Sequence, residues 1–226
     1  MKGIQIQKII RAMLIFLIAG LPAVVKCQSN TDGSMPQYLF DDFSKSTVRM
    51  KNGQVMTPEM NYNTVTGMMV FIKDETYYDL INSELIDTVY LNSFRFIPVG
   101  KVFYEVVANG TISGFIEHKG NLLPAGKPVG YGGTSQVASA DYVNVVNLSG
   151  GQFNLEIPSD YIVRKTSVCW IRKGTEWISF ETEKQLLKLF PEKASQIKAY
   201  IRENHLKIDK SEQLGRIVRY IAALNN

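Results

Sequence analysis

The middle of the chain, from Tyr38 to Phe180, carries short runs of β-branched and aromatic residues separated by glycine, asparagine, aspartate and proline. Runs of this kind, bounded by turn-forming residues, are typical of β-strands. The pattern predicts strands at residues 47–50, 55–61, 68–72, 86–91, 94–98, 102–107, 111–118, 142–148, 153–157, 167–172 and 176–180.

Glycine-containing pairs fall between many of these runs and supply the positive φ that tight hairpins need. Strands joined by so few residues must be antiparallel, because parallel neighbours need a crossover of about a dozen residues or more. We therefore predict an α+β fold whose main part is an antiparallel β-meander, arranged as a sandwich or a partial barrel. The glycine-containing pairs that separate the predicted strands are Asn52-Gly53, Asn109-Gly110, Lys119-Gly120, Gly150-Gly151 and Lys173-Gly174.

After Phe180 the apolar residues recur at about every 3.6 positions, which predicts helices at about 182–190 and 192–204. A third helix is expected from Asp209, because Asp209 and Glu212 have the spacing of a capping box. Helices this short are marginal alone in water, so we predict that the three-helix segment packs on the β-domain. The apolar stripes comprise Leu186, Leu187, Phe190, Ile197, Tyr200, Ile201, Leu214, Ile217, Val218, Ile221 and Leu224.

The first residues have the pattern of a cleavable export signal, in which a basic segment precedes an apolar run, here residues 12–25. This run is shorter than the roughly 18–20 residues of a spanning helix, so no transmembrane span is expected in the mature chain. We predict a signal peptide at residues 1–27 and a mature chain that begins at Gln28. The alternative is a lipid on Cys27, but Lys26 is not the small residue that usually precedes a lipidated cysteine.

Three segments are predicted to follow the signal: a disordered polar leader at 28–36, the β-domain at 37–180 and the helical segment at 181–226. Four of the 25 basic residues lie in the signal, and the remaining 21 equal the 21 acidic residues in number. A neutral mature chain has no long-range field that attracts phosphate backbones. Nucleic acid is therefore not an expected partner.

Cys169 is the only cysteine of the expected mature chain, which excludes an internal disulfide there. It lies in the apolar run Val168-Cys169-Trp170-Ile171. A thiol in such a run behaves as a small apolar side chain. We predict that Cys169 is buried and unreactive.

Few residues offer candidate chemistry. The two histidines, His118 and His205, belong to no close pair of the kind that binds metal, and His205 is expected near a helix C-terminus, where its charge suits the dipole. Glu117 and His118 could serve as acid and base, but neighbouring strand residues point to opposite faces. We therefore assign no catalytic, cofactor-binding or metal-binding residue, and no cofactor.

Residues 120–139 form the least ordinary segment, with five glycines and two prolines. The segment lacks the Gly-Lys-Ser/Thr ending of a phosphate-binding loop, so nucleotide binding is not expected. It is either a long connection between strands or a mobile flap over a ligand site. Ser135 has no nucleophile-elbow motif around it.

In three segments the chain resembles a family of uncharacterised exported proteins of Gram-negative bacterial envelopes. The segments are Tyr38-Leu39-Phe40, residues 91–106 (LNSFRFIPVGKVFYEV) and residues 185–208 (QLLKLFPEKASQIKAYIRENHLKI). The resemblance covers most of the mature chain. It implies a periplasmic, secreted or outer-membrane-associated protein, and it implies no activity or catalytic residue.

These observations favour a non-catalytic exported envelope protein that acts as a binding or scaffold module, with another envelope protein or an apolar ligand as partner. One alternative is a carrier in which a partly closed β-barrel holds a lipid or other apolar ligand, with Phe94, Phe96 and Tyr104 lining the cavity. Another is a hydrolase whose site includes Glu117 or His118.

Overall fold

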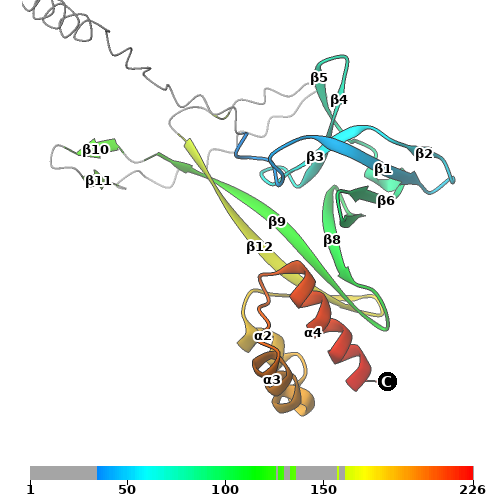
Figure 1. Cartoon of the computed structure of the whole chain (residues 1–226), viewed down its shortest axis with the longest axis vertical. Helices are drawn as coiled ribbons and strands as arrows, with labels where there is room; N and C mark the ends of the chain where they lie inside the picture. The colour runs from blue at the N-terminus through cyan, green and yellow to red at the C-terminus, as the bar shows by residue number, and fades with distance from the viewer. Residues whose placement is uncertain (1–34, 126, 130–132, 136–156, 158–160, 226) are drawn as a thin grey trace, which may run out of the picture. The chain divides into compact units, whose positions relative to one another are not determined.

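The computed structural model describes residues 35–125, 127–129, 133–135, 157 and 161–225 (Figure 1). The expected signal peptide and most of the expected leader lie outside this range, as do the strands predicted at 142–148 and, apart from Ile157, at 153–157. Nothing in the structure bears on those predictions.

The strands form one antiparallel sheet of 11 strands that is not closed, and helices follow it, which confirms the predicted α+β meander. The strand order is β13-β12-β9-β8-β7-β6-β1-β3-β4-β5, with β2 beside β1. Strands β10 (Lys127–Val129) and β11 (Gly133–Ser135) pair separately. The strands of the large sheet are β1 (Ser44–Met50), β2 (Val55–Met56), β3 (Glu59–Asn63), β4 (Met68–Lys73), β5 (Thr76–Asp79), β6 (Ile86–Leu91), β7 (Phe94–Val99), β8 (Val102–Ala108), β9 (Ile112–Pro124), β12 (Tyr161–Lys173) and β13 (Glu176–Phe180).

Two of the predicted glycine turns have the expected backbone, because Gly53 has φ +88° and Gly174 has φ +60°. The turn between β4 and β5 uses no glycine. Asp74 and Glu75 adopt φ 51° and 57° there, in the left-handed region that most residues avoid. Strand β5 was therefore not anticipated from the sequence.

Strands β9 and β12 extend beyond the predicted 111–118 and 167–172, and two further predictions about the strands are wrong. The strand expected at 55–61 is divided into β2 and β3 around Pro58, which has no N–H for a ladder hydrogen bond. Gly120, expected in a turn, lies inside β9 opposite Lys165. A Cβ at Gly120 would come within 2.4 Å of Thr64 Oγ1, so this glycine permits a close approach of β9 to the loop after β3.

The first hydrophobic cluster, here the sheet core, is built by the strands from β1 to β8. Within it the Tyr62 and Phe96 rings stack with centroids 5.5 Å apart. Phe96, expected to line a ligand cavity, is fully buried in this packing. The members of the sheet core are Val48, Met60, Tyr62, Met69, Leu80, Ile86, Val89, Leu91, Phe96 and Phe103.

Three helices follow the sheet: α2 (Glu183–Lys188), α3 (Ala194–Glu203) and α4 (Ser211–Leu224). The capping box lies at α2, where the side chains of Thr182 and Gln185 each accept a hydrogen bond from the other's backbone N–H. The box expected at Asp209 is absent, since the N-cap of α4 is Lys210 and makes no side-chain capping bond. No helix in the described ranges is long and apolar enough to cross a membrane.

The helices pack on one face of the sheet, as predicted. Helix α4 contacts β8 and β9 (Figure 1). A Cβ at Gly215 would lie 2.5 Å from the backbone oxygen of Val107, and one at Gly114 would lie 2.7 Å from Val218. The helix-side core formed in this way comprises Ala108, Ile112, Ile116, Cys169, Ile171, Phe180, Leu186, Ile197, Ile201, Leu206, Leu214, Ile217, Val218 and Ile221.

Cys169 is a free cysteine in the helix-side core, as expected, and only 3% of its surface is exposed. Its Sγ lies 3.6 Å from the backbone oxygen of Ile208 and donates a weak hydrogen bond to it. Burial, with lesser contributions from nearby carboxylates, raises the pKa of the thiol to about 12. The thiolate form that reacts is therefore scarce at neutral pH.

A buried carboxyl group lies on β5. Asp79 is 8% exposed, and its Oδ1 has no hydrogen-bond partner among the residues described. The Tyr38 hydroxyl is also buried and unpartnered within the described residues. Burial raises the pKa of Asp79 from its ordinary 3.8 to about 6. The charged carboxylate therefore destabilises the folded state.

We predict that Asp79→Asn stabilises the protein at high pH. The folded-state pKa of Asp79 lies above its unfolded value, so the cost of the charge appears as the pH rises above about 4 and is complete above about 7. From the shift of the pKa this cost is about 2–3 kcal/mol. Urea unfolding of both proteins should show the variant more stable at pH 8 and little different at pH 4. An equal difference at both pH values would contradict the assignment.

Candidate functional site

The neighbours Glu117 and His118 lie on β9 and point to opposite faces of the sheet, as the alternation of a regular strand requires. His118 Nε2 lies 2.7 Å from Glu105 Oε2, on the face that carries α4. Glu117 Oε2 accepts a hydrogen bond of 3.1 Å from Trp170 Nε1 on the other face. The two residues therefore belong to separate sites.

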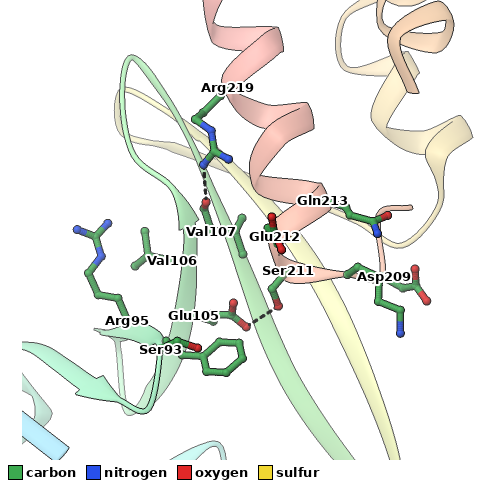
Figure 2. A pocket seen from close by; sticks show the side chains of 12 residues that line it. Ser93, Arg95, Glu105, Val106, Val107, Asp209, Ser211, Glu212, Gln213 and Arg219 are labelled. Atoms are coloured by element: carbon green, nitrogen blue, oxygen red, sulfur yellow. Dashed lines mark hydrogen bonds between the residues drawn. The ribbon is translucent and has the colours of Figure 1, made fainter. Parts of the chain in front are cut away.

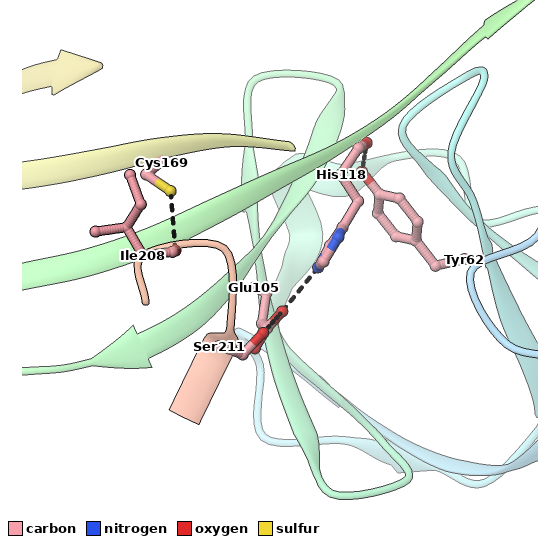
Figure 3. A network of polar contacts seen from close by, with 6 residues as sticks. All are labelled: Tyr62, Glu105, His118, Cys169, Ile208 and Ser211. Carbon is pink, nitrogen blue, oxygen red and sulfur yellow. Dashed lines mark hydrogen bonds and ion pairs between the residues drawn. The ribbon is translucent and has the colours of Figure 1, made fainter. Parts of the chain in front are cut away.

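Glu105 is the centre of a polar junction between the two cores (Figure 3). It is 3% exposed, and its Oε2 contacts both His118 Nε2 and the Ser211 hydroxyl, which donates over 3.0 Å. The Tyr62 hydroxyl donates to the backbone oxygen of His118 over 3.0 Å. The junction thus joins β3, β8, β9 and α4.

The carboxylate of Glu105 also explains why α4 begins without a side-chain cap. An anion beside a helix N-terminus interacts favourably with the partial positive charge there. Ser211, the first residue of α4, is held directly on this carboxylate. Glu105 is 106 residues away from Ser211 in sequence, so no local pattern at the helix start indicates it.

A groove of about 770 Å³ opens beside this junction, between β7–β8 and the first turns of α4 (Figure 2). Its walls carry charges of both signs, among them Asp209, Lys210 and Glu212. Arg219 Nη1 donates to the Val107 backbone oxygen over 3.4 Å. The mixed charges of this groove indicate no particular ligand.

The junction does not have the geometry of a nucleophilic site. Ser211 and His118 both contact the same oxygen of Glu105, whereas an activated serine needs its own hydrogen bond to the base. Among the residues described, no group of three or more His, Cys, Asp or Glu side chains could hold a metal ion. His205 lies apart, exposed just after α3 with φ 50°, and Ser135 lies in β11.

The sheet face opposite the helices carries a cluster of four aromatic side chains, here the aromatic face: Tyr104, Phe115, Trp170 and Trp177. Trp170 stacks on Tyr104 with centroids 5.7 Å apart, and Phe115 lies 4.6 Å from Trp177. Trp177 meets Trp170 edge to face at 6.5 Å. Phe115 and Tyr104 are buried, and the two tryptophans are half-buried.

Strand alternation produces this face. Phe115 pairs with Trp170, and Trp177 pairs with Arg172, while the alternate positions Ile116 and Cys169 point into the helix-side core. The sequence signal was one bulky aromatic residue on the second face of each of several strands whose other face was already apolar. Such strands are expected where both faces of a sheet are covered.

Polar groups surround the four rings. Glu117 accepts hydrogen bonds from Trp170 and from the Tyr104 hydroxyl, and it pairs with Lys119 Nζ at 3.1 Å. Burial and the neighbouring Glu117 raise the pKa of Tyr104 to about 12, so its hydroxyl remains a donor. The guanidinium carbon of Arg172 lies 5.3 Å from the Phe115 ring centre and 5.4 Å from that of Trp177.

The aromatic residues proposed to line a ligand cavity do not share one. Phe96 pairs with Glu105 and points into the sheet core, whereas Tyr104 points to the aromatic face. Phe94 packs at the edge of the sheet core, with its ring 6.5 Å from that of Phe96, and borders the groove beside α4. Phe94 and Phe96 therefore lie on one side of the sheet, and Tyr104 lies on the other.

Comparisons with known proteins return no relative. No protein-family model matches the chain, and no curated protein or solved structure matches it. What the protein does must therefore be inferred from its own residues.

Proposed function

We propose that this chain is a non-catalytic binding module of the bacterial envelope, and that its aromatic face is the docking surface for another protein. The observation that carries the proposal is a cluster of Tyr, Phe and Trp side chains with an arginine on the face opposite the helices. Tryptophan, tyrosine and arginine dominate the binding energy of protein–protein interfaces. An apolar centre with a polar rim is the usual anatomy of such interfaces.

A protein suits this surface better than an enclosed small molecule. The rings pack against one another, only the two tryptophans are partly exposed, and Glu117 and Lys119 lie beside them. The cations Arg95 and Arg172 extend the surface beside the rings and favour a partner that carries negative charge.

An envelope location is part of the same proposal. It is supported by the export pattern of the first 27 residues and by the resemblance to exported envelope proteins. Both supports come from the sequence.

The proposal is tested by photo-crosslinking in cells. A photoreactive phenylalanine analogue at Ser179, an exposed residue that pairs with Trp170, should give one adduct of defined mass. The same analogue at Lys198, exposed on α3, is the matched control and should give none. The adduct should disappear with Trp177→Ala and remain with Trp177→Phe, because the ring is the expected anchor.

Thermal unfolding of the variants establishes that the sheet remains folded. Adducts of equal yield from positions 179 and 198, or an adduct at 179 that does not depend on Trp177, would contradict docking on the aromatic face.

A further inference from the structure

A second cavity, here the basic cleft, opens beside the aromatic face and has a volume of about 310 Å³. Phe115 and Arg172 line both the cleft and the aromatic face. Ile97 and Val106 add apolar side chains, and the cations are Lys51, Arg95 and Arg172. The cleft therefore combines a few apolar side chains with positive charge, and most of its accessible lining is polar.

The three cations lack counter-ions within the described part of the chain. The only ion pairs found there are those of Glu105 with His118 and of Glu117 with Lys119. Asp87 is the single acidic residue lining the cleft, and it accepts a hydrogen bond of 2.9 Å from Thr88 Oγ1. The cleft consequently has a net positive charge.

The guanidinium groups of Arg95 and Arg172 are available to bind a planar anion. The guanidinium carbon of Arg172 lies over the rings of Phe115 and Trp177, and these cation–π contacts restrain the side chain while its N–H groups keep their capacity to donate. Arg95 is half-buried, and its guanidinium points away from Glu105 (Figure 2). A guanidinium fixed in this way offers parallel donors to the two oxygens of a carboxylate.

We infer that the basic cleft receives a carboxylate side chain, Asp or Glu, from an acidic segment of the partner protein. This inference rests on the proposed function, since the cleft adjoins the proposed docking surface. Ile97 and Val106 are the side chains that can contact the methylene groups of the acidic residue. Lys51, exposed at the margin, attracts the segment over a longer range and is screened by salt.

The probe is a synthetic octapeptide that alternates glutamate with leucine, and its control is the same peptide with glutamine for glutamate. Both tryptophans of the chain lie in the aromatic face, so tryptophan fluorescence of the full chain reports on this surface alone. We expect a saturable change with the glutamate peptide and about tenfold weaker binding of the glutamine peptide.

Substitutions locate the binding site. Arg172→Gln should weaken binding of the glutamate peptide about tenfold, and Lys51→Gln should weaken it several-fold without disturbing any ring contact. The matched control is Arg202→Gln, which removes one exposed positive charge from α3 and should leave binding unchanged. Binding should also weaken between about 50 and 500 mM salt.

Several outcomes would overturn the inference. Equal binding of the two peptides would exclude carboxylate recognition, and binding of polygalacturonate but not of the peptide would replace the acidic protein segment with an acidic glycan. Adducts at position 179 that depend on Trp177 but not on Arg172 or Lys51 would leave the proposed function standing and remove the basic cleft from it.

Discussion

Ile217→Asp should lower the free energy of unfolding of the whole protein by at least about 4 kcal/mol. Ile217 is fully buried in the helix-side core, so the substitution removes apolar packing and places a carboxylate among apolar side chains. Both tryptophans lie on β12 and β13, which means that urea unfolding followed by their fluorescence measures the sheet. A lower midpoint there shows that the helices stabilise the strands.

Arg216→Asp is the matched control, because it introduces aspartate at the neighbouring exposed position of α4 and should change stability by roughly 0.5 kcal/mol. Removal of all residues after Phe180 should have a larger effect, with a melting temperature lower by about 10 °C or more. A truncated chain that melts at the same temperature and with the same cooperativity would show that the helices are an independent appendage.

Glu105→Ala should cost about 2–4 kcal/mol, because it removes a buried side chain and the acceptor that two polar groups share. The substitution leaves His118 and Ser211 without their shared acceptor and removes the anion from the start of α4. Amide hydrogen exchange should accelerate first in residues 211–214, because that turn loses its side-chain hydrogen bond to β8.

Glu105→Gln tests whether charge or shape matters at the junction. The amide fills the same space and accepts one hydrogen bond, so the expected cost is smaller, about 1–2 kcal/mol. A loss of unfolding free energy below about 1 kcal/mol for Glu105→Ala would contradict the structural role of the junction. It would indicate that Glu105 serves the groove beside the junction instead.

Local patterns predicted much of the fold. The strands at Ile86–Leu91 and Glu176–Phe180 have the expected bounds, because turn residues flank each alternating run. Some errors are local, such as the break at Pro58, whereas others arise because a residue responds to a distant part of the chain. The sequence predicts a turn at Gly120, but this position lies in a strand and needs glycine because Thr64 leaves no room for a side chain.

The sequence predicts less of the candidate sites than of the fold. The opposite orientation of Glu117 and His118 follows from strand geometry alone. The identity of the residue that contacts His118 does not follow from strand geometry, because Glu105 is brought to it by the pairing of β8 with β9. The aromatic face likewise depends on the register that places Trp177 beside Arg172 and Phe115 beside Trp170. Register is set by pairing between strands, which a single run of residues does not contain.

Because the sheet is open, β5 has a free edge in the part of the chain that the structure describes. A free edge can pair with a strand of another molecule, and an inward-pointing charge is one of the ways in which proteins prevent such association. Asp79 meets this description, since it is a buried carboxyl group on a strand of four residues. Its raised pKa makes the protection dependent on pH. Acidification below about 6 should therefore make each molecule harder to unfold while making its edge easier to join to a neighbour, so that thermodynamic stability and resistance to aggregation change in opposite directions.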